Sequence, residues 1–273
     1  MGSIIKMSGG SFGEKWIYHD HGINKTTYKW IPYFLNHLDL TITNSDFELI
    51  KLKANGVRDN KIIRIHNGID PNAYSFSEET RIFLRNKHRT EFGISEDDFV
   101  LGYIGRLSPE KGCGLLLPAF RIANENNPQL KLLIVGDGIL RKKLQDEVRG
   151  SYLDHKIIFA GFRSDIPGLL TSMDTLLLPS YMETFSLTTL QAMGSGLPVI
   201  ASDTGGNPEQ IVNNFNGYLF ETGDYDSLAG RINEIINKKD RVTMGYNGNL
   251  LVRTYLNISR MVDEIEYHYK RKV

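Results

Sequence analysis

Short runs of branched and aromatic residues alternate with longer amphipathic stretches along nearly the whole chain. The short runs have the length and composition of strands, and the longer stretches have those of helices. Strands are expected at residues 15–19, 39–43, 61–65, 99–105, 130–135, 156–159, 175–178 and 199–201. Helices are expected, among others, at residues 25–36, 45–54, 78–92, 228–236 and 255–269. This alternation predicts an α/β protein with parallel sheets.

A turn-rich passage at residues 67–72 divides the pattern into two series. The second series, at about residues 95–250, has enough strands for a complete doubly wound domain. The first supplies only three strands before residue 67, whereas a domain commonly takes about 100–150 residues. We therefore expect either a fragment of a longer protein or a shortened chain that needs a partner to complete its sheet. The fragment is favoured, because an open sheet edge is a liability for a chain standing alone.

Composition and charge exclude several classes of function. Lys and Arg number 32, as do Asp and Glu, and no basic stripe with interleaved aromatics is visible, so no nucleic-acid partner is expected. The single cysteine, Cys113, excludes an internal disulfide and a cysteine zinc site. No apolar run has the length of a membrane helix or of a signal peptide. The expected location is the cytoplasm.

The most informative segment is residues 183–198, one expected helix between two expected strands. In a parallel sheet, the start of such a helix lies at the carboxyl edge of the strands, where ligands bind. Ser186 and its neighbours would offer unpaired backbone N–H groups to an anion there. Glu183 precedes them, and Gln191 lies two turns into the helix. Taken by itself, Glu183 is explained by default as an acid stabilised by the helix dipole.

A second segment, residues 105–112, directly follows an expected strand and carries two cations five residues apart, Arg106 and Lys111. Two such cations can both reach a diphosphate, with charge-assisted contacts of about 1.5–3 kcal/mol each. Solvated charges on an ordinary strand-to-helix turn are the simpler explanation of this segment taken by itself.

Together these segments resemble the donor-binding part of retaining glycosyltransferases of family 4, which have the GT-B fold. That family has two glutamates flanking seven residues, followed by Gly-Pro and an apolar strand. Here the first glutamate is Glu183, the ending is Met193–Ile200, and Gln191 stands in the second glutamate's place. Asn67-Gly68-Ile69-Asp70 is similar to the family's interdomain hinge.

The resemblance implies two Rossmann-like parallel-sheet domains, of which the N-terminal one is incomplete. Residues 1–70 would be part of an acceptor-side domain, residues 71–250 the domain that binds the nucleotide-sugar donor, and residues 251–273 a closing C-terminal helix.

The resemblance also implies site residues. The diphosphate would be bound by five residues: Arg106, Lys111, Phe185, Ser186 and Leu187. Glu183 and His21 would be catalytic and orient the sugar, with His19 as the alternative histidine.

The nucleoside would be held at the other end of the same site. Gln191 would contact the ribose, since an amide can still accept and donate a hydrogen bond. Phe162 and Arg163 would lie near the base. A helix-face glutamine and a solvated loop arginine are the alternatives for Gln191 and Arg163.

The implied reaction moves a sugar from a nucleoside diphosphate sugar to a hydroxyl acceptor with retention, without a cofactor or a metal ion. The acceptor would be a saccharide or a lipid-linked glycan, with peripheral contact at the inner face of the cytoplasmic membrane. Nucleotide-sugar epimerases and phosphorylases share the fold, which therefore does not fix the chemistry. A catalytically impaired nucleotide-sugar-binding fragment or accessory subunit is the non-enzymatic alternative, suggested by the missing strands and by Gln191.

Two patterns that suggest a metal site, and one acid that suggests a catalyst, are interpreted otherwise. His19-Asp20-His21 lacks the further ligands of a metal site. Asp224 precedes an expected helix and is expected to cap it rather than to bind a metal. Glu209 opens a short helix and is expected to be a partner of a helix dipole.

Overall fold

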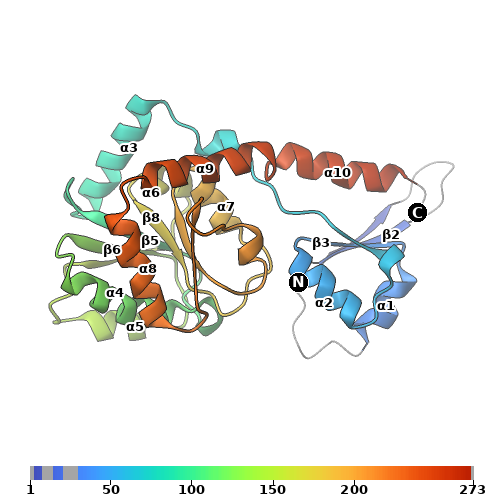
Figure 1. Ribbon diagram of the computed structural model, residues 1–273, viewed down its shortest axis with the longest axis horizontal. Coiled ribbons are helices and arrows are strands. Elements are labelled where there is room, and N and C mark those ends of the chain that lie inside the picture. The colour runs from blue at the N-terminus through green and yellow to red at the C-terminus, as the bar shows by residue number, and fades with distance from the viewer. Residues whose placement is uncertain (1–2, 8–14, 21–29, 272–273) are drawn as a thin grey trace.

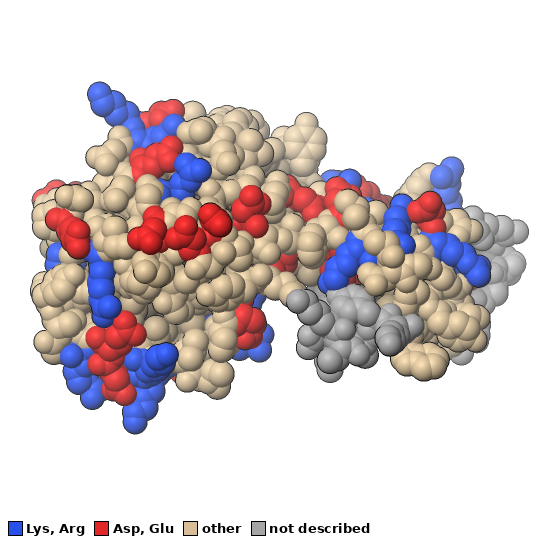
Figure 2. Space-filling model, turned by 60° about the horizontal axis from the view of Figure 1, so that its bottom comes forward, with Lys and Arg blue, Asp and Glu red and all other residues tan. Residues whose placement is uncertain are grey.

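The computed structural model of the chain describes residues 3–7, 15–20 and 30–271. Two sheets, each flanked by helices, form two lobes that are joined by a linker and by the long C-terminal helix (Figure 1). Acidic and basic side chains occur on both lobes on the face that Figure 2 shows. The strands expected at 130–135 and 175–178 are confirmed at those bounds, and the other expected strands are confirmed to within two residues.

The first sheet has the strand order β1-β2-β3-β4. Its strands are β1 (Ser3–Met7), β2 (Lys15–Asp20), β3 (Leu40–Thr43) and β4 (Ile62–Arg64). Strands β2 to β4 are parallel, but β1 pairs with β2 antiparallel, which the sequence did not predict. Apolar residues of α1 (Ile31–His37) and α2 (Asp46–Ala54) pack on one face, and α10 (Ile258–Lys270) packs on the other.

The second sheet is parallel throughout, in the order β10-β9-β8-β5-β6-β7. Its strands are β5 (Phe99–Ile104), β6 (Leu130–Val135), β7 (Ile157–Gly161), β8 (Thr175–Leu178), β9 (Val199–Ser202) and β10 (Gly217–Phe220). One face carries α4 (Leu116–Glu125), α5 (Arg141–Val148) and α8 (Tyr225–Asn237). The other carries α6 (Ile166–Leu170), α7 (Leu187–Gly194) and α9 (Arg241–Thr254), with α3 (Glu78–Glu91) against α6.

The backbone crosses between the lobes twice, and the two crossings lie side by side. Ile69 donates its N–H to Leu256, and Ile258 donates its N–H to Ile69. A Cβ added at Gly68 would lie 2.3 Å from the carbonyl oxygen of Asn257, so only glycine fits there. The linker after β4 is therefore held against the junction between α9 and α10.

Helix ends explain why several elements begin where they do. The Ser45 hydroxyl accepts from the N–H of Glu48 at the start of α2, and Asp224 accepts from two N–H groups at the start of α8. The capping role predicted for Asp224 is thus confirmed. The helix expected at 25–36 includes residues outside the described part of the chain, and its described portion is α1 from Ile31.

Candidate functional site

The strand order of the second sheet reverses between β5 and β8. In open α/β sheets, ligands bind at such a switch point, outside the carboxyl ends of the strands. The loop with Arg106 and Lys111 follows β5, and the loop with Glu183 follows β8. The topology therefore brings together the two segments that the sequence predicted to form one site.

A direct ion pair joins these two loops. Lys111 Nζ lies 2.7 Å from Glu183 Oε2, and both side chains are largely buried, 27% and 13% exposed. Gly112 makes the approach possible, because it has a φ of +62° and a Cβ there would lie 1.8 Å from the carbonyl oxygen of Pro179. The Ser180 hydroxyl also donates to Glu183 Oε2, at 3.3 Å. Glu183 is thus held by two partners rather than projecting freely from a helix end.

Arg106 lies in the same loop as Lys111, directly after β5. The buried Tyr103 hydroxyl donates to the carbonyl oxygen of Arg106 at 2.9 Å, which fixes the backbone. Burial raises the pKa of Tyr103, so the hydroxyl remains a donor at neutral pH. The Arg106 side chain is 68% exposed. Its Nη2 lies 3.8 Å from Glu110 Oε1, and an exposed ion pair of this length is weak. Its guanidinium is available to an incoming anion.

The start of α7 differs from the expectation in one respect. The N–H of Ser186 is not open to an anion, because it donates to Gln210 Oε1 at 2.9 Å. The Gln210 side chain also donates to the Ser186 carbonyl. The Ser186 hydroxyl caps α7 by accepting from the N–H of Thr189. Within the described chain, no acceptor is assigned to the N–H groups of Leu187 and Thr188. Those two groups, and not that of Ser186, are therefore the N–H groups at the start of α7 that have no described acceptor to compete with an anion.

The three residues predicted to hold the nucleoside differ in exposure and in their partners. Gln191 lies against Tyr74; burial raises the pKa of the Tyr74 hydroxyl, and a hydrogen bond with Gln191 partly opposes this. Phe162 is 81% exposed at the end of β7. Arg163 is paired with Glu91 and with Asp165, whose pKa it lowers to about 2.

The Arg163 side chain therefore links the loop after β7 to α3. The nucleoside-binding roles of Gln191, Phe162 and Arg163 stay predictions.

The first sheet forms the opposite side of the site. His21, the predicted catalytic histidine, lies outside the described residues. His19, the alternative, has its Nε2 2.6 Å from the hydroxyl of Tyr269 in α10. Asn44 Nδ2 donates to Thr184 Oγ1 at 3.4 Å, one residue from Glu183. A cavity of about 150 Å³ lies here, lined by His19, Asp20, Ile42, Thr43, Asn44, Ile65, Asn67, Met261 and Ile265.

Glu209 joins the lobes, a role that the sequence did not predict. Its carboxylate accepts from the N–H groups of Asp46 and Phe47 at the start of α2, at 2.8 and 2.9 Å. It lies 2.8 Å from His66 Nε2, and the His66 ring stacks on Phe185 at a centroid distance of 4.6 Å. Glu209 is a helix-dipole partner as expected, but of a helix in the other lobe. No local signal marks this contact, because its partners are 143 to 163 residues away.

This carboxylate gives the fold a defined pH dependence. Burial by itself raises the pKa of Glu209, but the hydrogen bonds from His66 and the two backbone N–H groups outweigh it, so the pKa lies below its usual 4.5. Such a group stabilises the fold above its unfolded pKa, and this stabilisation is lost as the pH falls through the folded value. In urea unfolding from about pH 7 to about pH 3, wild type is expected to lose more stability than Glu209→Gln. Arg64, Asp46 and His66 face the position in both proteins, so an equal pH dependence would contradict the assignment.

Two other features have the outline of a binding site. Asp46, His66 and Glu209 have ligand atoms within 4.8 Å of one another and could geometrically hold a metal ion. Both oxygens of Glu209 already accept hydrogen bonds there, and Arg64 adds a positive charge beside His66. This arrangement favours a hydrogen-bonded cluster over a metal site.

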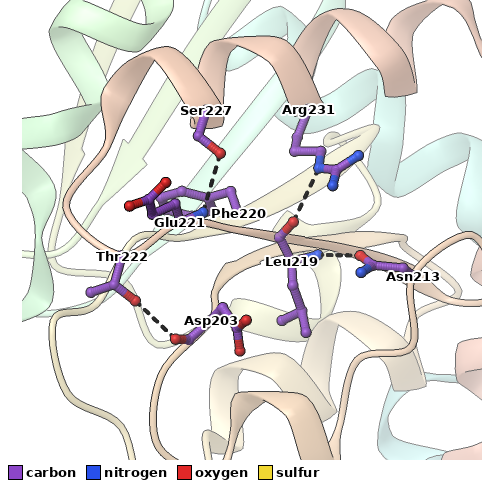
Figure 3. A pocket seen from close by; sticks show the side chains of 8 residues that line it. All are labelled: Asp203, Asn213, Leu219, Phe220, Glu221, Thr222, Ser227 and Arg231. Atoms are coloured by element: carbon purple, nitrogen blue, oxygen red, sulfur yellow. Dashed lines mark hydrogen bonds between the residues drawn. The ribbon is translucent and has the colours of Figure 1, made fainter.

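An open hollow of about 550 Å³ lies along β10. Figure 3 shows that its side chains largely hold backbone groups: Arg231 donates to the carbonyl of Leu219, Ser227 accepts from the N–H of Glu221, and Thr222 donates to the carbonyl of Asp203.

Among the helices that the structure describes, none combines the length and the apolar character of a membrane span.

Comparison with solved structures establishes the fold. Anabaena Alr3699/HepE in complex with UDP and glucose matches with a TM-score of 0.85 and 27% identity, over 94% of this chain and 71% of that one. The sucrose-phosphate synthase of Thermosynechococcus elongatus matches with a TM-score of 0.82 over 95% of this chain and 68% of that one, but at 22% identity it supports the fold alone. The protein has the GT-B fold that the sequence predicted.

Sequence comparison establishes the family. The UDP-Gal:alpha-D-GlcNAc-diphosphoundecaprenol alpha-1,3-galactosyltransferase of Escherichia coli is 30% identical over 251 residues, which are 90% of this chain and 64% of that protein. The capsular polysaccharide biosynthesis glycosyltransferase CapM of Staphylococcus aureus is 25% identical over 93% of this chain and 69% of its own length. The sequence profile of the glycosyl transferases group 1 matches residues 85–250, which include every residue of the Lys111–Glu183 site on the second sheet. The chain belongs to the family of group 1 glycosyl transferases.

Proposed function

We propose that the chain transfers a sugar from a UDP-sugar to a hydroxyl of a saccharide or lipid-linked glycan, with retention at the anomeric carbon. The observation that carries the proposal is the Lys111–Glu183 pair, which lies at the switch point between β5 and β8 beside the start of α7. Support for uridine comes from the E. coli relative, whose name specifies UDP-Gal, and from HepE, which was solved with UDP and glucose. As a member of family 4, the enzyme would have residues 71–250 as its donor-binding domain.

The proposed chemistry is electrostatic. When the bond from the sugar to the diphosphate breaks, negative charge grows on the leaving phosphate oxygens. Lys111, Arg106 and the free N–H groups of α7 would stabilise that charge in place, and such stabilisation supplies most of the rate enhancement in many enzymes. Glu183 would accept hydrogen bonds from hydroxyls of the sugar and so orient it, while Lys111 balances its charge. Since two cations serve the diphosphate, the proposed chemistry needs no metal ion.

Binding of UDP tests the proposal directly. UDP at a hundred times its dissociation constant should add about 2.7 kcal/mol to the stability of the folded chain, and so raise Tm. Arg106→Ala is expected to bind UDP about 10- to 100-fold more weakly, because one charge-assisted contact is lost. Thermal unfolding with UDP, GDP and ADP measures both the affinity and the choice of base.

Lys142→Ala is the matched control, since it removes a cation from an exposed position of α5. It should keep the wild-type response to UDP. A folded wild-type chain that responds to none of the three nucleotides would refute the proposed donor site.

The accessory-subunit alternative makes a different prediction. A chain that binds UDP but turns over no UDP-sugar, and becomes active only with a second polypeptide, would support it. Turnover that is unchanged after treatment with EDTA would support the metal-independent chemistry. Co-sedimentation with vesicles would test the predicted contact with a membrane surface.

A further inference from the structure

The start of α2 is completed by a side chain from the other lobe. Glu209 lies in the short helix η7 (Asn207–Glu209), which follows β9 of the second sheet. Its Oε2 accepts from the N–H of Asp46 and its Oε1 accepts from the N–H of Phe47. These are the first N–H groups of α2, which have no partner within the helix and carry part of the positive end of its dipole. One half-buried carboxylate thus binds the helix with both oxygens.

The geometry also determines which ring nitrogen of His66 carries the hydrogen. Arg64 Nη1 lies 3.2 Å from His66 Nδ1, and an arginine can only donate. Nδ1 must therefore accept, so Nε2 carries the hydrogen and donates it to Glu209 Oε2 at 2.8 Å. Arg64 also donates from Nε to Asp46 Oδ1 at 3.1 Å. These hydrogen bonds link Arg64, Asp46, His66 and Glu209 in a ring, which the backbone N–H of Asp46 closes at Glu209.

This network packs against the loop between β8 and α7 that carries Glu183, here called the donor loop. The His66 ring lies nearly parallel to that of Phe185, with an interplanar angle of 19°, and Phe185 directly precedes the cap of α7. The N–H of Gly206 donates to the carbonyl of Glu183 at 3.0 Å. A Cβ on Gly206 would lie 1.7 Å from the carbonyl oxygen of Thr184 and 3.2 Å from Ser45 Cβ. The segment that carries Glu209 is therefore wedged between the donor loop and the start of α2.

We propose that His66 and Glu209 are positioning residues that fix the gap between the donor loop and the carboxyl edge of the first sheet. Sugar transfer requires that gap to have one width, because a misplacement of about 1 Å in a bimolecular site can cost about 100-fold in rate. In this role both residues act through the groups that they hold, not on the reacting atoms. The catalytic part of the inference rests on the proposed function, whereas the positional part stands on these contacts alone.

The distance between the lobes tests the positional part. Nitroxide labels on Ala54→Cys in α2 and Lys143→Cys in α5 would report it by pulsed electron resonance, since the natural Cys113 is buried. The wild-type background should give one narrow distribution. Glu209→Gln should broaden or shift it, because an amide NH2 would face backbone donors.

Glu125→Gln makes the same chemical change at an exposed position of α4 and should leave the distribution unchanged. His66→Gln can still donate an N–H to Glu209. Its distance distribution should therefore resemble that of wild type more than the distribution of His66→Ala does. A distribution for Glu209→Gln and His66→Ala that matches wild type would overturn the proposal.

Kinetics separate positioning from a general loss of stability. In Glu209→Gln, UDP should bind as it does to wild type, because the diphosphate contacts lie within one lobe. Turnover of a UDP-hexose should fall by about 100-fold with little change in KM. A lowered Tm with unchanged turnover would assign Glu209 a structural role only and refute the positioning role. If wild type fails to bind UDP, the proposed function fails, and the distance measurement still decides on the positional role.

Discussion

Lys111→Ala is expected to lower kcat/KM for a UDP-sugar about 100- to 1,000-fold, which corresponds to about 2.7–4 kcal/mol of transition-state stabilisation. The loss has two sources. The leaving diphosphate loses a cation held in a largely buried position, and Glu183 loses the partner 2.7 Å away that holds it in place. Because the second effect disturbs the sugar as well as the phosphate, the change should exceed that of Arg106→Ala, whose side chain is mostly exposed. Steady-state kinetics with UDP-glucose and UDP-galactose measure it.

The double variant with Glu183→Ala separates the two sources. If Lys111 acts partly by holding Glu183, the losses of the single variants should not add in the double one. Lys142→Ala again serves as the control for removal of a cation. Activity of Lys111→Ala near that of wild type would show that the pair at the switch point is not the donor site.

Asp174→Ala is expected to destabilise the protein by about 3–5 kcal/mol, the largest effect on stability that we predict. Asp174 accepts from Arg85 and Arg89 of α3, at 2.8 and 2.9 Å, and from the N–H of Val100 at the start of β5. Arg89 is only 4% exposed, and burial lowers its pKa despite the attraction of Asp174. Without Asp174, a buried guanidinium would lose its counter-charge, and the first residues of β5 would lose a hydrogen bond.

Urea unfolding at neutral pH measures the effect on the free energy of unfolding. Asp146→Ala provides the contrast, because its pair with Arg149, at 3.5 Å, lies on the surface and should contribute less than about 1 kcal/mol. A loss for Asp174→Ala as small as that for Asp146→Ala would mean that solvent or the carbonyl acceptors around Arg89 compensate its charge.

Much of the second sheet could be predicted because its central strands are buried on both faces. Such strands are continuous apolar runs, and β6 and β8 match their predicted bounds. Helix α9 could not be predicted, since Gly245 and Gly248 lower helix propensity. The structure shows why glycine is needed: a Cβ on Gly245 would lie 1.9 Å from the carbonyl oxygen of Gly196, where α9 packs on the end of α7.

The residues of the candidate site likewise fall into those that local sequence patterns reveal and those that only the fold brings together. Arg106, Lys111 and Glu183 could be found because each follows a strand in a turn whose chemistry is local. Their direct contact depends on Gly112, and the occupied N–H of Ser186 depends on Gln210, 24 residues away. His66 and Glu209 are single polar residues without a motif. What brings them together is the placement of one lobe on the other, which no local pattern encodes.

The paired crossings at Ile69 and at Leu256–Ile258 limit how the two lobes can move. A single peptide strand between two bodies permits rotation about three axes, whereas two strands joined by hydrogen bonds form a narrow ribbon. Such a ribbon bends across its flat face far more easily than it twists or shears. While the network of His66 and Glu209 holds, the lobes should keep one separation. When that network is broken, they should rotate about this one axis only, so that the same two edges still face each other.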